Sequence, residues 1–284
     1  MRPVIEKKKF RVIHVIYIVL ILICVFAIGV GVYMQYFKDE KLGVIFGISA
    51  EENDEEIITL KKDFLNIFTN DINVLEEYPE NVNKLKSDAD LIVMAYSNQD
   101  EKDNYSIDIK IPYFNISSEN AIKINQEIRS VFRDKAESVL KYNGTEKIVY
   151  NVKYKAYLKN EVLSLIILSE LKEGNDSHQR IVIQSYNYNL KDNKIVSIND
   201  LIKNKSLDVK SANEKIKDEI DSAQEQNIKL KELGYNVNVR DSKDSKYKIE
   251  NSEVYFVGEK GYLYVVYPYG NTEFTSEMDV IIFK

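Results

Sequence analysis

The sequence is poor in the residues that build covalent links and metal sites. Its 284 residues include one cysteine, two histidines and no tryptophan. The single cysteine, Cys24, lies inside a long apolar run, so the rest of the chain has no disulfide and no thiolate metal ligand. We therefore expect a packed core to stabilise the remainder.

Catalytic and cofactor-binding motifs are also missing. The sequence has no glycine-rich phosphate loop, no His-Glu-x-x-His pattern and no Gly-x-Ser-x-Gly elbow. The one histidine beyond the apolar run is His178, which has only Asp176 at close range, so neither a zinc site nor a Ser-His-Asp triad is indicated. The segment from Asp241 to Asp244 lacks the acid spacing and the glycine of a calcium loop. We predict no enzyme, no cofactor and no metal site.

Residues 12–36 form the long apolar run and contain no Asp, Glu, Lys or Arg. A helix needs about 20 apolar residues to cross a bilayer, whereas a cleaved signal peptide has an apolar core of about 7–15 residues and a small-residue cleavage site. No such site follows directly, so an uncleaved transmembrane helix is predicted. Lys7, Lys8, Lys9 and Arg11 precede it. Under the positive-inside rule they hold residues 1–11 in the cytoplasm as a short tail and place the C-terminal part outside the cell membrane.

The chain beyond this segment is acidic. The whole chain carries a formal net charge of −6, and residues 1–37 hold five basic side chains and one acid, so residues 38–284 carry −10. This sign argues against nucleic acid as a partner. It favours a cationic partner or simply a soluble surface.

Residues 37–88 are predicted to be an extracytoplasmic stalk that contains an amphipathic helix. Between residues 55 and 69 the apolar side chains recur at helical spacing, namely at Ile57, Ile58, Leu60, Phe64, Leu65 and Phe68. Asn70-Asp71 then breaks the pattern. We expect the helix to pack on the domain that follows or, alternatively, on a partner protein.

Residues 89–284 are predicted to form one extracellular α+β domain. Strand patterns cover residues 91–97, 105–112, 148–158, 162–171, 180–190, 195–198, 254–257, 262–267 and 278–283. Short polar links such as Asn98–Glu101 predict antiparallel pairing. Two main helices are expected over residues 119–142, after a cap at Ser117 or Ser118, and over residues 208–233, before Gly234. The predicted fold is an antiparallel sheet with two main helices on one face, preceded by one transmembrane helix.

Tyrosine is abundant, with 20 copies. Tyr186 and Tyr188 lie two residues apart and share one face of a predicted strand. Amphipathic rings of this kind are favoured at binding surfaces, and they are also good strand formers. Both a binding role and a structural role therefore stay open for these tyrosines.

The order of elements over about residues 104–284 resembles a known extracellular domain. The segments that carry the resemblance read YSIDIKIPYF, IKINQEIRSVF, YNVKYKAYL, LSLIILSEL, EGNDSH and SYNYNLKDNKIVSINDLI. They are similar to the domain shared by RsiV-type anti-sigma factors and the N-terminal region of PdaC-type peptidoglycan deacetylases. Where that family often has a Gly-Gly-Ala-His-like loop, this chain keeps His178 and lacks the paired glycines. The short cytoplasmic tail could not grip a sigma factor, and no deacetylase domain is expected.

The resemblance implies recognition at the cell envelope, in some family members of lysozyme. We therefore predict a single-pass membrane protein whose extracellular domain binds or senses lysozyme or a cell-wall fragment. His178, Tyr186 and Tyr188 are the candidate binding residues. The alternative is an accessory or structural subunit that binds another membrane protein and has no ligand of its own.

Overall fold

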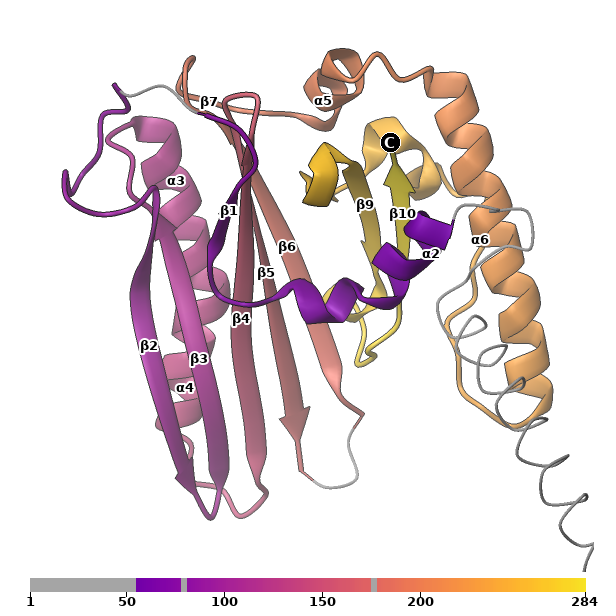
Figure 1. Cartoon of the computed structure of the whole chain (residues 1–284). Helices are drawn as coiled ribbons and strands as arrows, with labels where there is room; N and C mark the ends of the chain where they lie inside the picture. Colours follow the sequence, from indigo (N-terminus) through magenta and orange to yellow (C-terminus); the bar gives the residue numbers. More distant parts are fainter. Residues whose placement is uncertain (1–54, 78–80, 175–177) are drawn as a thin grey trace, which may run out of the picture. The chain divides into compact units, whose positions relative to one another are not determined.

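The computed structural model describes residues 55–77, 81–174 and 178–284, all within one compact unit of residues 46–284. The predicted transmembrane segment, residues 12–36, lies outside the described residues. No helix in the described ranges combines the length and the apolar content that a membrane crossing requires. The described part of the chain has the predicted α+β class with mostly antiparallel strands (Figure 1).

The elements follow one another in two groups. The first group contains α2 (Glu55–Lys62), η1 (Phe64–Ile67), β1 (Ile72–Val74), β2 (Ile92–Lys102), β3 (Tyr105–Phe114), α3 (Glu119–Ile128), the π-helical turn η2 (Arg129–Arg133), α4 (Asp134–Leu140) and β4 (Ile148–Lys159). The second contains β5 (Val162–Glu173), β6 (Arg180–Asn189), β7 (Lys194–Ile195), α5 (Ile198–Asn204), α6 (Val209–Glu232), η3 (Ser245–Tyr247), η4 (Ile249–Asn251), β8 (Val254–Val257), η5 (Glu259–Gly261), β9 (Leu263–Pro268), η6 (Tyr269–Asn271) and β10 (Met278–Phe283).

Side-chain caps fix where the helices begin. The Ser118 side chain accepts a hydrogen bond from the backbone of Ala121 at the start of α3, as predicted, and Asp208 caps α6 in the same way. Ser197 and Asp200 form a reciprocal capping box that begins α5. The strand predicted over residues 195–198 was therefore wrong beyond Ile195, because this box turns the chain into a helix.

The larger sheet has seven strands in the order β2-β3-β4-β5-β6-β7, with β1 beside β4. The β2–β3, β4–β5 and β5–β6 pairs are antiparallel, as predicted. The β3–β4 pair is parallel, because α3, η2 and α4 carry the chain back across the sheet between the two strands. Asn98–Glu101 was predicted to be a turn but continues β2, which pairs with β3 as far as Lys102.

The outer edge of β4 is shared by two strands. The first half of β4 pairs with β3, and its second half pairs in parallel with β1. Asn70 leads into β1 with a positive φ of 62° and bonds the backbone of Tyr154 through both its main chain and its side chain. Since β1 lies within the predicted stalk, the described part of that stalk belongs to the α+β domain.

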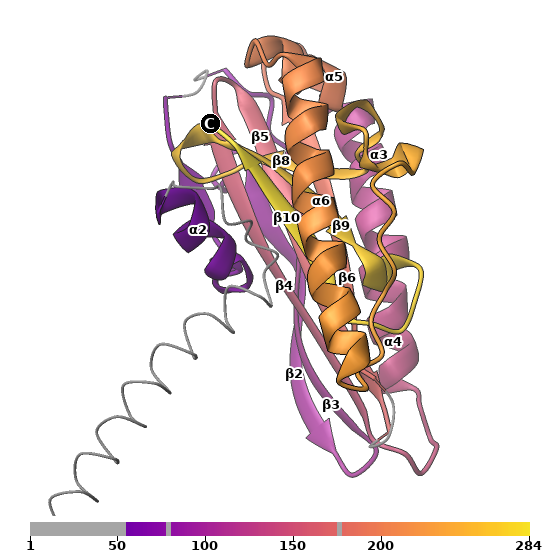
Figure 2. The same ribbon diagram turned by 90° about the vertical axis from the view of Figure 1, so that its right-hand side faces the viewer.

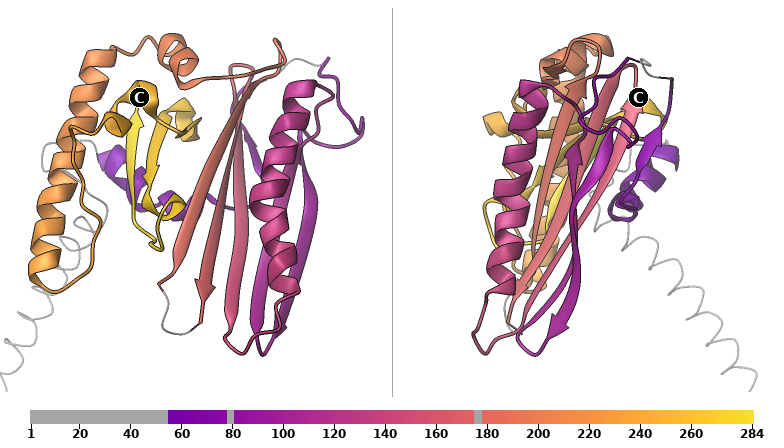
Figure 3. Two further views of the ribbon diagram at one scale, coloured as in Figure 1. Left: turned by 180° about the vertical axis from the view of Figure 1, so that it is seen from behind. Right: turned by 90° about the vertical axis from the view of Figure 1, so that its left-hand side faces the viewer.

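The smaller sheet is antiparallel, in the order β10-β9-β8, and lies between the larger sheet and α6 (Figures 2 and 3). Along β9, Leu263 and Val265 pack with α6, while Tyr264 and Val266 pack toward the larger sheet. Strand β8 docks on β5 and β6 through side chains, because Ser164 and Ser185 accept hydrogen bonds from its backbone. The two main helices thus cover two different sheets.

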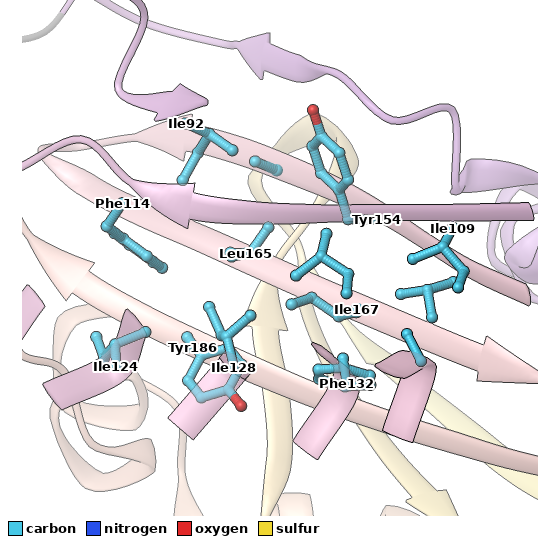
Figure 4. Packing of buried hydrophobic residues seen from close by; sticks show 14 of the residues in the cluster. Ile92, Ile109, Phe114, Ile124, Ile128, Phe132, Tyr154, Leu165, Ile167 and Tyr186 are labelled. Atoms are coloured by element: carbon cyan, nitrogen blue, oxygen red, sulfur yellow. The ribbon is translucent and has the colours of Figure 1, made fainter. Parts of the chain in front are cut away.

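A hydrophobic core fills the space between α3–α4 and the larger sheet. Figure 4 shows Ile124, Ile128 and Phe132 of the helices facing Ile167 and Tyr186 of the sheet. This helical segment buries one apolar stripe at the spacing that its sequence predicts. The face of the sheet that carries Tyr186 is therefore an interior face.

Helix α2 is attached to the domain by a buried ion pair. The Lys61 ammonium lies 2.8 Å from the Glu219 carboxylate of α6, and the two side chains are 1% and 8% exposed. Ile57, Phe64 and Phe68 are buried around it in the core shared with the smaller sheet. Helix α2 therefore packs on its own domain, which is one of the two arrangements expected from the sequence.

Candidate functional site

The two candidate tyrosines lie in the core. Tyr188 is fully buried, and its hydroxyl lies 2.6 Å from the Ser118 hydroxyl and donates to the Asn193 side chain at 3.2 Å. Tyr186 is also buried and donates to Gln184 at 2.7 Å. Burial raises the pKa of both phenols, so they stay protonated donors. Their rings pack beneath α3, an arrangement that corresponds to the structural role left open above.

His178 occupies a different place. It is exposed in the connection between β5 and β6, just before β6 begins at Arg180, whereas the tyrosines lie toward the other end of that strand. The structure therefore does not bring the three candidate residues together on one surface. The neighbour of His178, Gln179, donates a hydrogen bond to Glu170 at 3.1 Å. His178 thus lies at the rim of the sheet face that Glu170 occupies.

This face is the side of the larger sheet opposite α3 and α4. In the lower half of Figure 1 it is turned toward the viewer, with no described helix or strand in front of it. On β3, β4 and β5 its side chains alternate with core residues, and its members, including those on β2, are all exposed or half-buried. We call it the open face, and its members are Ser97, Gln99, Glu101, Ser106, Asp108, Lys110, Val149, Asn151, Lys153, Glu170 and Lys172.

One row of the open face alternates amides and carboxylates. Directly paired positions on β2, β3, β4 and β5 carry Gln99, Asp108, Asn151 and Glu170. Neighbouring strands are about 4.8 Å apart, so the row spans about 14 Å. Gln179 extends it through its bond to Glu170. Amides donate and accept while carboxylates only accept, so the row presents both kinds of hydrogen-bonding group to a ligand.

Charges of both signs flank this row. Lys110, Lys153 and Lys172 contribute three ammonium groups, and the Glu101 carboxylate is paired at 2.6 Å with Lys147. Together with Asp108 and Glu170, the face holds three carboxylates beside its three lysines, and Lys147 adds a fourth ammonium group at Glu101. The acidic surplus of the chain is therefore not concentrated here, and the face suits a ligand with both amino and carboxylate groups.

The open face ends where the smaller sheet and the segment before β1 begin to cover the larger sheet. Two positions beyond Lys153, the ammonium group of Lys155 is buried and bonds Thr69 and Asp71. On β5, Leu168 is buried in the core between the two sheets. A long contact of 3.5 Å joins Asn151 to Glu170, so these groups can reorient toward a ligand.

The described residues hold no cluster of three or more His, Cys, Asp and Glu side chains that could bind a metal ion. The acids of the segment 241–244 serve as local caps. Asp241 accepts from the backbone of Lys243, and Asp244 accepts from the backbone of Lys246.

Part of the open face was visible in the sequence. The alternation over residues 105–112 predicts that Ser106, Asp108 and Lys110 point away from the core. The sequence does not show that these outward positions stay uncovered, because coverage depends on where the smaller sheet docks. The sequence does not predict the burial of Tyr186 and Tyr188 either, because the alternation of side chains along a strand does not show which face of the sheet a helix covers.

Comparisons with known proteins find distant similarity among solved structures. No protein-family model matches the chain. No curated protein matches it either. Among solved structures, it is similar to the crystal structure of a DUF3298 family protein from Pseudomonas aeruginosa PAO1, with a TM-score of 0.32 and 12% identity, covering 68% of this chain and 86% of that chain. The resemblance to RsiV- and PdaC-type domains stays a prediction.

Proposed function

We propose that this protein is a single-pass membrane protein whose extracytoplasmic domain binds a cell-wall fragment on the open face without catalysing a reaction. The observation that carries the proposal is the row Gln99, Asp108, Asn151 and Glu170, which spans four strands and remains open. A rigid sheet holds these groups in register, so little ordering is required when a ligand binds.

The charge of the open face distinguishes between the two ligands expected from the sequence. A site for a cationic protein such as lysozyme is expected to be an acidic patch, because opposite charge speeds the encounter. The open face is instead balanced, with Lys110, Lys153 and Lys172 beside its carboxylates. Peptide parts of wall fragments carry both amino and carboxylate groups, so they match this face better than a uniformly cationic surface does.

The membrane anchor in this proposal rests on the sequence. Residues 12–36 have the length and composition of a transmembrane helix, and four basic residues precede them. The alternative role as an accessory subunit relied on a stalk helix available to a partner. Ile57 of α2 and Phe64 of η1 are buried within the domain itself, so this observation favours the binding role.

The test uses the full chain in lipid nanodiscs, with purified wall fragments in one titration and lysozyme in the other. Lys153→Glu reverses a charge at the centre of the open face, and Lys123→Glu makes the same change on the exposed side of α3. A charge-assisted hydrogen bond contributes about 1.5–3 kcal/mol, so we expect Lys153→Glu to weaken wall-fragment binding by about tenfold or more.

Lys123→Glu is expected to bind like the unmodified chain, because it changes the net charge equally but lies away from the open face. Equal binding by the two variants would remove the open face as the site. Saturable binding of lysozyme, without binding of the wall fragments, would show that lysozyme and not a wall fragment is the ligand. Binding of neither would leave the accessory-subunit role as the better account.

A further inference from the structure

The end of α6 carries a group of exposed apolar side chains. Leu233 is 74% exposed and Val239 is 71% exposed, with Tyr235 and Ile228 at 62% and 50%. Single exposed apolar residues are common on protein surfaces, whereas groups of them mark interaction sites. We call these four residues the apolar tip.

The backbone brings the four residues together. Gly234 adopts a φ of +88° directly after α6 and turns the chain back along the helix. Asn227 then donates to the backbone oxygen of Asn238 at 2.6 Å, which holds the segment before Val239 against the turn of α6 that carries Ile228. The apolar tip therefore consists of the last two turns of α6 and the segment that follows them, at the lower end of that helix in Figure 2.

A buried network supports the segment that returns from the tip. The Arg240 guanidinium donates to Asp279 at 2.7 Å and to Glu277 at 3.1 Å, and it lies 4.6 Å from the centre of the Tyr269 ring. The backbone N–H of Arg240 donates to Gln224 of α6. The returning segment is therefore attached both to α6 and to the smaller sheet, so the tip is held in place while its apolar side chains face outward.

The size of the tip decides between a protein and a lipid partner. Its four exposed side chains offer on the order of 500 Å², compared with about 800 Å² per partner in a stable protein complex. A lipid surface can deform around such a tip. Lys229 and Lys231 are exposed beside it, together with Glu225 and Glu232. Lysines next to aliphatic side chains and a tyrosine are typical of membrane interfaces.

The predicted anchor keeps a bilayer within reach of the tip. Residues 37–54, 18 positions, separate the predicted helix from the start of α2. An extended chain of this length spans up to about 60 Å. Helix α2 contacts α6 at Glu219, and Leu233 follows 14 residues later, about 21 Å along the axis of α6. This distance is shorter than the span of the extended connecting chain.

We propose that the apolar tip inserts into the lipid headgroup region of the bilayer that anchors the chain. This contact would set the orientation of the domain on the membrane, and it rests on the anchor of the proposed function. Tethering raises the effective concentration of the surface, so a small apolar contact suffices.

The absence of tryptophan from the sequence allows a direct test. Leu233→Trp introduces a single reporter at the tip. Ile195→Trp introduces one at an exposed position of β7, which Figure 1 shows at the same end of the domain as α5 and the start of α6. A third variant, Ile21→Trp, places the reporter in the predicted anchor. Each full-length variant is reconstituted into vesicles of phosphatidylglycerol and brominated phosphatidylcholine, because bromine quenches tryptophan that contacts the acyl chains.

We expect Leu233→Trp to show a blue shift and loss of emission, and Ile195→Trp to show neither. Equal emission from these two variants would overturn the lipid contact. A blue shift at Leu233→Trp that grows with the density of protein in the vesicles, without quenching by bromine, would show that the tip contacts a second copy of the chain. That result would also overturn the lipid contact. Quenching at Ile21→Trp reports on the anchor separately, so its failure counts against the proposed function.

Discussion

Replacing Lys61 by methionine is expected to destabilise the protein by about 3 kcal/mol. The Lys61 ammonium lies 2.8 Å from Glu219, and both side chains are almost completely buried. Methionine has a similar length but no charge, so the change leaves a buried carboxylate without this cation. Breaking a buried ion pair by removing one partner costs about 3–5 kcal/mol, and the lower value applies because Lys215 also lies within 3.8 Å of Glu219.

The double variant Lys61→Met/Glu219→Leu separates charge from packing. Replacing both members of a buried pair by apolar residues is often neutral or stabilising. We therefore expect the double variant to lie within about 1 kcal/mol of the unmodified protein. Recovery of this kind would show that the loss in the single variant comes from the Glu219 carboxylate that has lost the Lys61 ammonium group.

The assay is urea unfolding of the full chain in detergent, followed by circular dichroism. Lys62→Met is the matched control, because Lys62 is the adjacent residue of α2 and is exposed. A surface change of this kind is expected to stay within about 0.5 kcal/mol. If Lys61→Met were as stable as Lys62→Met, α2 would not be docked on α6, and the inclusion of the stalk in the domain would be refuted.

Three further predictions test other parts of the structure. Gly270→Ala places a Cβ 1.9 Å from the backbone oxygen of Ile181, so we expect a loss of about 2 kcal/mol or more in urea unfolding, and an unchanged midpoint would contradict this packing. Tyr188→Phe removes the hydroxyl that bonds Ser118 and is expected to lower the free energy of unfolding by about 1 kcal/mol. Ligand affinity should stay unchanged, and lost affinity in a folded variant would show that the tyrosines belong to the binding site. Burial raises the pKa of Tyr247 to about 12, so above pH of about 10 the unfolded state loses this proton before the folded state does. Stability should therefore fall as pH rises from about 10, with buried tyrosinate absorbance appearing together with loss of circular dichroism and not before it.

The local pattern of the chain predicted many of the elements. Strands over residues 254–257 and 278–283 have the expected bounds, and the helix expected over residues 208–233 is α6, Val209–Glu232. These segments combine a clear hydrophobic period with an end signal such as Asp208 or Gly234. The strand predicted over residues 195–198 is wrong beyond Ile195, because the capping box of Ser197 begins α5 within it.

Long-range relations were harder to predict. Polar residues in Asn98–Glu101 predict a turn, yet this part of the edge strand β2 is not fully buried on either face, so it accepts polar side chains on both. Parallel pairing of β3 with β4 depends on the path of the helices between them. Likewise, the open face exists because the smaller sheet covers only part of the larger one, and no local pattern encodes that position.

Lysine labelling with mass spectrometry tests the central proposal most directly. The full chain in nanodiscs is acylated with and without a saturating wall digest. Lys110, Lys153 and Lys172 lie on the open face, whereas Lys123 lies on α3. We predict that the digest protects the first three and leaves Lys123 unchanged. Unchanged labelling on the open face, or protection at Lys123 instead, would contradict the assignment of this face as the binding site.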